Sequence, residues 1–597
     1  MSTRALLLVV LSCVIASAAC GPSHSGGAKD AGASGDGAID GPPLLHTLET
    51  ITIDPPDQIV QLDLNATGAQ AFTATAQYAD GTSDDVTGDV AWAVGNPNVG
   101  AMTGPLLAIP AFTASAAETS TITAMLNGVT GQGQITVVAY RQTGPQQDFF
   151  FILPFQDMAG PATKPLDFST KIPGLDVFFL MDTTGSMAGE IANLQSALTN
   201  TVIPGIQAAV TDSQFGVGAL EDFPVSPFGS TVPQNDCGTG LNEPDQPIKV
   251  RQTITSATAA IAAGVASLST NGQPIGCGND WPEGGIEAIY QAATGEGLSS
   301  PAPTSVPANH TGIGGVGFRA GTMPVIVTIT DADSHGVGEP GTCTIQSGSF
   351  VFNADQAYSG PVAAVAHTRQ QAKDALAGIC ARVVGVAAIQ SSGAFGATCL
   401  PESYLTDLAT TTGARVPPAA WDVGTRPAGC AANQCCTGQN GVGRATDGAG
   451  LCPVVFDVAT DGTGVSASIV TGIQMLTRFA TFDVTSDPQG VTTDVDGNAL
   501  PAPHTTAEFL KTITPTGFTL PPPPPALPNP TFDASTFHTV TPGTVVSFNV
   551  DAFNDFVPQT DKAQIFRATI RVLAGGCTAL DQRDVLILVP PAPIAIN

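Results

Sequence analysis

The stretch Asp176–Glu190, DVFFLMDTTGSMAGE, decides the fold that we predict for this chain. Its first part, Asp176–Met181, is a short apolar run rich in strand formers, which is typical of a buried strand in a parallel sheet. Small polar residues follow, and then an amphipathic helix is predicted. Asp182, Thr184 and Ser186 therefore lie in a loop at the carboxyl end of a strand, where open α/β sheets place ligand sites. One carboxylate and two hydroxyls offer the hard oxygen ligands that suit Mg²⁺.

Three further stretches extend this pattern. Leu220–Phe228 (LEDFPVSPF) follows a strand-like run, and Asp280–Ile289 (DWPEGGIEAI) opens a predicted helix. Pro324–Asp331 (PVIVTITD) is a second apolar strand that ends in an aspartate. The Asp-x-Thr-x-Ser spacing that begins at Asp182 resembles the metal-ion-dependent adhesion site of von Willebrand factor A domains. In order and type, the four stretches together resemble the I-like domain of integrin β subunits.

This resemblance implies a central cation site that holds Mg²⁺ or Mn²⁺ and is completed by a carboxylate from a partner. Its ligands in this chain would be Asp182, Thr184, Ser186, Glu283 and Asp331. The family also has flanking cation sites, for which Ca²⁺ is a candidate, and the matching acids here are Asp222, Asp280 and Glu190. Gly278 and Gly189 stand where the family has an asparagine and a second acid, so we expect weaker flanking sites.

Strand-like and helix-like segments alternate through the central region, which we delimit as residues 174–480. This alternation predicts a mostly parallel, doubly wound sheet of the von Willebrand A or Rossmann-like type, with helices on both faces. The candidate strands are 176–181, 215–219, 324–330, 382–389 and 454–458. The candidate helices are 190–209, 255–268, 284–293, 362–379, 402–411 and 464–479.

The flanking regions are predicted to be all-β. Residues 45–140 contain short strands with turn punctuation and resemble bacterial immunoglobulin-like domains, which predicts a β-sandwich. A strand-like run in 141–173 and several in 481–597 suggest that the central domain is inserted into a second β-sandwich, similar to the hybrid domain of integrin β subunits. The segment Pro542–Ala552 resembles a stretch of that domain.

The amino-terminal residues predict export and anchoring. Residues 1–19 have the charge and the short apolar run of a signal peptide, and Cys20 follows a segment that resembles a bacterial lipoprotein cleavage box. Residues 20–44 would then form a lipidated cysteine and a flexible linker. We expect a membrane-anchored lipoprotein of the outer membrane or cell surface, attached by lipid only. Ordinary secretory cleavage nearby is the alternative.

Composition limits the partners and predicts disulfides. The net charge of −30 argues against nucleic acid and against anionic membrane surfaces. Of 12 cysteines, Cys13 lies in the predicted signal peptide and Cys20 is the predicted lipidation site, which leaves an even number in an exported chain. We expect Cys237 to pair with Cys277. Four other cysteines should pair among themselves, with a connectivity that the sequence leaves open: Cys430, Cys435, Cys436 and Cys452.

These observations favour a surface-anchored, cation-dependent adhesion or ligand-binding protein that is not an enzyme. Its partner would be a protein or a polysaccharide that presents a carboxylate. One alternative is a metal-assisted hydrolase, for which His335 is the only candidate base near the metal, although we expect a solvated loop histidine there. A second alternative is a structural lipoprotein whose metal site stays empty.

Overall fold

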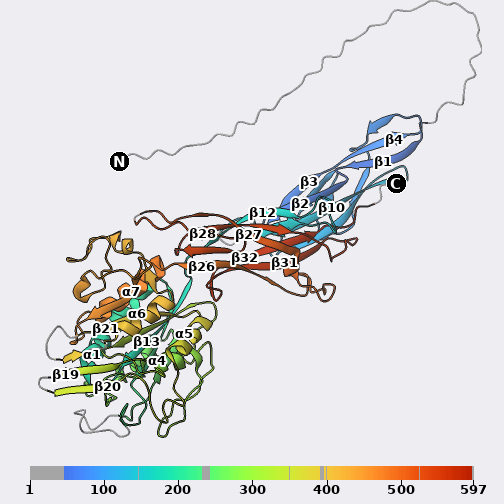
Figure 1. Ribbon diagram of the computed structural model, residues 1–597. Coiled ribbons are helices and arrows are strands. Elements are labelled where there is room, and N and C mark those ends of the chain that lie inside the picture. The colour runs from blue at the N-terminus through green and yellow to red at the C-terminus, as the bar shows by residue number, and fades with distance from the viewer. Residues whose placement is uncertain are drawn as a thin grey trace, which may run out of the picture.

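The computed structural model describes residues 46–594 except 145–146, 231–242, 348–349, 390–394, 398–399 and 524. The predicted signal peptide, Cys20, the linker and Cys237 lie outside the described residues. Figure 1 shows three bodies in a row, with a β body formed by the first described strands (blue), a long β body in the middle and an α/β body at the far end. In the described part of the chain, no helix has the length and apolar character needed to cross a membrane.

The α/β body, residues 174–480, is built on a six-stranded sheet in the order β15-β14-β13-β18-β21-β25. Its strands are β13 (Gly174–Asp182), β14 (Asp212–Leu220), β15 (Lys249–Thr255), β18 (Met323–Thr330), β21 (Arg382–Ala388) and β25 (Val455–Val458). All neighbours pair in parallel except β15, which is antiparallel to β14. Every residue of β13 and β18 is buried, as their apolar runs predict. Strand β15 was not predicted from the sequence.

The helices of this body follow the predicted alternation. They are α1 (Ala188–Ala197), α2 (Ile203–Gln207), α3 (Thr258–Ala266), α4 (Gly285–Thr294), α5 (Arg369–Gly378), α6 (Glu402–Thr411) and α7 (Val465–Phe479). The single helix predicted over 190–209 is divided by a π-helical turn, because Pro204 cannot donate a backbone hydrogen bond. The helix predicted from residue 362 begins only at Arg369, where Thr368 and Gln371 form a capping box.

Smaller elements complete the α/β body. Short strands are β16 (Ser269–Thr270), β17 (Gln273–Pro274), β19 (Thr342–Ser347), β20 (Phe350–Asp355), β22 (Phe395–Ala397), β23 (Arg415–Val416) and β24 (Cys452–Pro453). Strands β19 and β20 form an antiparallel hairpin that the sequence analysis did not predict. One turn of 3₁₀ helix, η1 (Gly185–Met187), connects β13 to α1.

The middle body, which we call the sandwich body, takes strands from both sides of the α/β body. Its sheets have the orders β11-β32-β31-β26-β29-β28 and β12-β30-β27. The strands are β11 (Phe149–Ile152), β12 (Ala162–Ser169), β26 (Phe482–Gly490), β27 (Leu510–Thr519), β28 (Thr531–Phe532), β29 (Thr536–Val540), β30 (Val545–Ala552), β31 (Gln564–Ala574) and β32 (Thr578–Val589). The buried rings of Phe537 and Phe548 pack edge to face between the two sheets, with centroids 5.1 Å apart.

The amino-terminal body contains ten strands in three small sheets, ordered β1-β4-β5, β2-β10-β9-β6 and β3-β8-β7. They are β1 (Leu48–Asp54), β2 (Asp57–Asp63), β3 (Gly68–Ala71), β4 (Thr73–Tyr78), β5 (Ser83–Asp85), β6 (Ala91–Val94), β7 (Ala101–Thr103), β8 (Leu106–Ile109), β9 (Ala116–Leu126) and β10 (Val129–Tyr140). Tyr140 stacks on Phe150 of β11 at 4.6 Å, which joins this body to the sandwich body. Its immunoglobulin-like character stays a prediction.

Disulfide bonds crosslink the described part of the chain at several places. Cys430 pairs with Cys436 and Cys435 with Cys452, which confirms that these four cysteines pair among themselves. A third bridge, Cys380–Cys577, was not predicted. It joins the loop after α5 to the turn between β31 and β32, so that it crosslinks the α/β body to the sandwich body. Cys277 is also disulfide-bonded, but its predicted pairing with Cys237 stays a prediction.

We predict that replacing Cys380 and Cys577 by serine destabilises the protein more than replacing Cys430 and Cys436. The first bridge spans 197 residues and the second spans 6. In the chain-entropy model these loops correspond to roughly 5 and roughly 2 kcal/mol. Urea denaturation of the two double variants measures the difference. Equal or reversed effects would show that the junction bridge does not restrict the unfolded chain.

Candidate metal centre

The loops after β13 and β18 bring the predicted acids to one edge of the sheet. These strands are adjacent and parallel, so Asp182, the last residue of β13, and Asp331, the residue after β18, lie at the same end. Glu283 joins them from the loop before α4, because its backbone N–H donates to Asp333 (2.9 Å) and its carbonyl accepts from His335 (2.8 Å). All three residues are buried, and none of them is more than 8% exposed.

Hydroxyl groups hold the first of these carboxylates in place. Asp182 Oδ1 accepts hydrogen bonds from the hydroxyl (2.7 Å) and the backbone N–H (2.9 Å) of Thr184. Asp182 Oδ2 accepts from the hydroxyl of Thr330 at 2.7 Å. Ser186, which is exposed in η1, hydrogen-bonds to Asp331. Thr184 and Thr330 therefore orient Asp182, and Ser186 contacts Asp331.

Several buried carboxylate oxygens at this edge have no hydrogen-bond partner in the described structure. They are Glu283 Oε2, Asp280 Oδ1 and both oxygens of Glu190. A buried oxygen that carries charge is costly without a compensating partner. A divalent cation would supply that partner, and the carboxylate and hydroxyl donors match its oxygen preference. The residues present therefore fit a Mg²⁺-type ion.

The pKa values of these buried carboxyl groups are raised, as expected where no positive charge compensates them. Burial raises the pKa of Asp182 to about 6, with hydrogen bonds from Thr330 and Thr184 opposing the rise. Burial and the charge of Asp182 raise the pKa of Asp331 to about 7. Burial first, and then Asp182 and other acids, raise the pKa of Glu283 well above its usual value. Such clustered shifts are common at sites that bind a charged ligand.

A second cluster contains Asp222, Asp280 and His335, whose potential ligand atoms lie within 4.8 Å of one another. This group could hold a metal ion, and it includes two acids that we predicted for a flanking cation site. His335 Nδ1 lies 2.7 Å from Asp222 Oδ2, and Nε2 lies 3.0 Å from the Asp355 carbonyl oxygen. Burial lowers the pKa of His335, but the charges and hydrogen bonds around it outweigh burial and raise the pKa above its usual value.

The expectation that His335 is solvated is wrong, because its side chain is fully buried. The rings of Phe228 and Tyr358 lie 5.0 and 4.9 Å from the imidazole, and the Tyr358 hydroxyl donates to Asp222 at 2.7 Å. These rings come from segments far from His335 in sequence, so no local pattern could predict the burial.

The other predicted flanking acid, Glu190, is buried in the first turn of α1. Burial, followed by the charges of neighbouring acids, raises the pKa of Glu190 to about 8. One of these acids is Asp461, which lies in the loop between β25 and α7. Asp461 was not predicted as a site residue from the sequence. A Cβ at Gly189 would lie 2.6 Å from the backbone of Asp461. The approach of this loop explains why Gly189 stands where the resemblance calls for a second acid.

Two further acids that the sequence analysis missed organise the loops around the site. Glu221 accepts from the Thr183 hydroxyl at 2.6 Å and forms a 2.7 Å ion pair with Lys249. Asp245 accepts from the backbone N–H groups of Cys277 (2.9 Å) and Gly278 (3.0 Å). Asp245 lies in a long Gly- and Pro-rich segment that carries no motif, so only its contacts show its role.

Residues 170–298 match the family model of the integrin beta chain VWA domain. The matched segment contains most of the acids and hydroxyls at this sheet edge, but it ends before β18 and Asp331. It covers less than half of the chain. The resemblance that we drew from the motifs is therefore supported for this part of the α/β body. A search of curated protein sequences gave no match.

Comparison with solved structures gave weak likenesses. One is the pilus adhesin SpaC from Lactobacillus rhamnosus GG in an open conformation, with 11% identity, a TM-score of 0.26, and coverage of 81% of this chain and 54% of SpaC. Another is proximal thread matrix protein 1 from the mussel byssus, with 9% identity, a TM-score of 0.24, and coverage of 52% and 48%. This chain thus spans about half of each, and at such TM-scores the likeness supports no argument.

Proposed function

We propose that this protein is a surface-anchored adhesion or ligand-binding protein that depends on a divalent cation and has no enzymatic activity. The observation that carries the proposal is the group of buried carboxylates at the sheet edge where β13 and β18 end, in which Glu190, Asp280 and Glu283 have oxygens without hydrogen-bond partners. Part of this group lies in the segment that matches the integrin beta chain VWA family. We also infer that the α/β body is an inserted von Willebrand A domain, that the sandwich body is hybrid-like and that the amino-terminal body is immunoglobulin-like.

The chain's own residues would hold Mg²⁺ or Mn²⁺ through Asp182, Thr184, Ser186, Glu283 and Asp331. When bound, the ion supplies positive charge and a coordination position for an oxygen from a partner. Asp182 is oriented for this role by the hydroxyls of Thr184 and Thr330. The cluster at Asp222 and Asp280 is a candidate for a second ion, with Ca²⁺ the natural choice among oxygen-rich sites.

A partner with a carboxylate suits this arrangement best. The chain carries a net charge of −30, so without a cation the acidic site would repel an anionic partner. A bound divalent ion reverses the local sign of the potential. We therefore propose a protein or a polysaccharide that presents carboxylates, and not nucleic acid.

The hydrolase alternative gains no support from the geometry. It required His335 as a general base, yet both imidazole nitrogens are engaged and the residue is fully buried. A general base must reach the proton that it removes. The alternative of a structural protein with an empty site is decided by measuring metal binding in solution.

The adhesion proposal is tested on two immobilised surfaces, polygalacturonate and gelatin. The methyl ester of polygalacturonate, in which the carboxylates are blocked, is the control. We expect binding to at least one carboxylate-bearing surface in Mg²⁺, loss of that binding with chelator and recovery with added Mn²⁺. Blocking the carboxylates should prevent binding. Binding that is indifferent to chelator, or equal on the acid and its ester, would contradict the proposed mode of capture.

The proposed lipid anchor gives a separate prediction. Wild-type protein should partition into the membrane fraction, whereas Cys20→Ser should be released into the soluble fraction, because a thiol is required for lipid attachment. Quantitative immunoblotting of the two fractions measures this. A Ser17→Ala variant, which keeps the cysteine, should stay in the membrane fraction. Equal partitioning of wild type and Cys20→Ser would rule out the anchor.

A further inference from the structure

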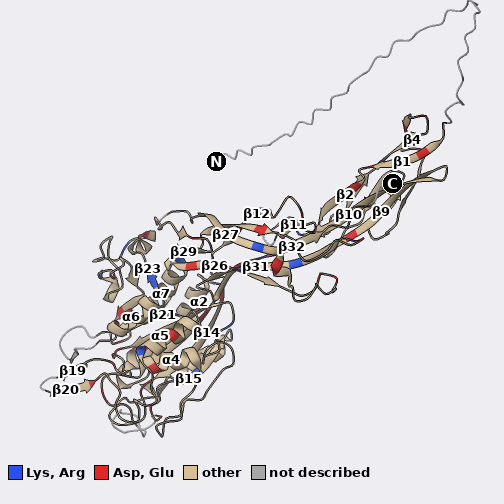
Figure 2. Cartoon of the chain, turned by 45° about the vertical axis from the view of Figure 1, so that its right-hand side comes forward, with Lys and Arg blue, Asp and Glu red and all other residues tan. Residues whose placement is uncertain are grey.

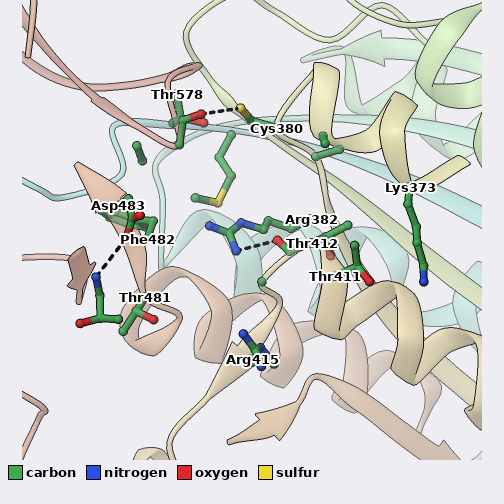
Figure 3. Close-up of a pocket in the computed structure, with 17 residues that line it drawn as sticks. Lys373, Cys380, Arg382, Thr411, Thr412, Arg415, Thr481, Phe482, Asp483 and Thr578 are labelled. Carbon is green, nitrogen blue, oxygen red and sulfur yellow. Dashed lines mark hydrogen bonds between the residues drawn. The ribbon is translucent and has the colours of Figure 1, made fainter. Parts of the chain in front are cut away.

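A pocket lies at the junction between the α/β body and the sandwich body. Its volume is about 400 Å³, which is in the range of small-molecule sites. One wall is formed by the starts of β18 and β21 and by the ends of α5 and α6, and the opposite wall by β26, β29, β31 and β32 (Figure 3). Because Met323 and Arg382 line it from the starts of parallel strands, the pocket is at the opposite sheet edge from Asp331.

Arg382 is the unusual residue of this pocket. Its Nη1 donates to the carbonyl oxygen of Thr412 at 2.6 Å, and no carboxylate among the described residues forms an ion pair with it. Burial, and then the charge of Arg415, lower the pKa of Arg382 to about 10. A desolvated cation without a counter-charge is unfavourable. The chain has 50 acidic residues against 20 Lys and Arg, so acids for pairing are not scarce (Figure 2).

The backbone is shaped around this guanidinium group. Gly413 has φ +70°, and a Cβ at that position would lie 1.9 Å from Arg382 Nη1. A side chain there would displace the guanidinium from the place that it occupies in Figure 3, near the middle of the lining. Glycine at this position therefore provides both the left-handed conformation and the space for the guanidinium.

The other charged lining residues already have partners. Lys373 forms a 2.7 Å ion pair with Asp407, and Arg415 forms a 3.2 Å ion pair with Asp447. Asp483 on the sandwich wall accepts hydrogen bonds from His538 (3.0 Å) and from the backbone N–H of Thr539 (3.2 Å). Arg415 Nε is buried without a hydrogen-bond partner, which leaves a second donor near Arg382. Among the described lining residues, Arg382 is thus a cation without a carboxylate partner, and Arg415 Nε is an additional unpartnered donor.

We propose that this pocket binds a small organic anion through a carboxylate or phosphoryl group. The planar fork of an arginine suits both groups because it donates two parallel hydrogen bonds. Thr411 and Thr481 also line the pocket, and their hydroxyls can donate to further oxygens. Since the lining comes from both bodies, the bound anion contacts both and stabilises their present orientation. This site is independent of the cation-dependent adhesion proposed above.

The test uses full-length protein from which divalent cations and then the chelator have been removed by dialysis, so that metal binding does not contribute to the measured heat. Inorganic phosphate and succinate are titrated separately by calorimetry. We expect saturable binding of at least one of them, and Arg382→Gln should weaken it by about tenfold or more, because a charge-assisted hydrogen bond is lost. The matched control is Arg478→Gln, which removes the same charge from an exposed position at the end of α7 and should leave the affinity unchanged.

The two probes distinguish the chemistry of the ligand. Tighter binding of phosphate identifies a phosphoryl ligand, and tighter binding of succinate identifies a carboxylate. Circular dichroism checks that each variant is folded. If Arg382→Gln is unfolded, Arg382→Lys keeps the charge without the fork and should also bind more weakly than wild type. Absence of saturable binding of both probes, or unchanged affinity in the folded Arg382 variants, overturns the proposal.

Discussion

Asp331→Asn is expected to weaken Mg²⁺ binding by roughly a hundredfold or more and to abolish cation-dependent adhesion. Loss of a residue that only orients a metal ligand already lowers metal affinity by about 10- to 100-fold, and loss of a direct carboxylate ligand should cost at least as much. The substitution keeps the shape of the side chain but removes one of the negative charges that compensate the ion. Calorimetric titration of Mg²⁺ and Mn²⁺ into wild type and variant measures the loss, alongside the adhesion assay.

Asp333→Asn is the matched control for this experiment. It removes a carboxylate two residues away, whose oxygens accept hydrogen bonds from Ser334 N–H (2.8 Å) and Gln356 (2.6 Å). That variant should retain most of the metal affinity. Thr184→Ala should lie between the two, because it removes a neutral ligand and a hydrogen bond to Asp182. Unchanged metal affinity in Asp331→Asn would contradict the assignment of the central site.

The second expected result concerns pH. Without a divalent cation, the α/β body should lose stability as pH rises from about 5 to about 8, by about 5 °C in its thermal midpoint. The pKa values of Asp182, Asp331 and Glu190 are raised to about 6, about 7 and about 8. A raised pKa means that the folded state binds protons more tightly than the unfolded state does. The stabilisation from this tighter proton binding is complete below the pKa of the group in the unfolded state. It is lost as the pH rises through the pKa of the group in the folded state.

Saturating Mg²⁺ should remove most of this pH dependence, because the ion compensates the ionised carboxylates that destabilise the metal-free protein. Scanning calorimetry at pH 5, 6, 7 and 8, with and without Mg²⁺, tests this. In the metal-free state, Asp331→Asn should be less sensitive to pH than wild type, since one of the titrating groups is gone. A metal-free midpoint that rises over this pH range would refute the electrostatic explanation.

The sequence predicted the central elements closely because their signals are local. The short apolar runs 176–181 and 324–330, rich in strand formers, predict buried strands, and both are confirmed within β13 and β18. The residue that follows each strand then lies at the same sheet edge, because the two strands are parallel neighbours. Asp182 and Asp331 were therefore expected at this edge from the two apolar strands together with the resemblance to the integrin β I-like domain.

Residues whose environment depends on distant segments could not be predicted in this way. His335 is buried by Phe228 and Tyr358, and Gly189 is explained by its approach to Asp461 in a loop far along the chain. The Cys380–Cys577 bridge joins residues 197 positions apart, and sequence alone does not give disulfide connectivity.

The sequence by itself determined the α/β alternation, the β character of the flanking regions and the acids and hydroxyls after the central strands, because these follow from local periodicity and residue chemistry. The tertiary structure decided which carboxylate oxygens are left without partners, how His335 is enclosed and where Arg382 lies in the junction pocket. Burial and electrostatic compensation depend on groups brought together from many parts of the chain, so only the folded arrangement specifies them.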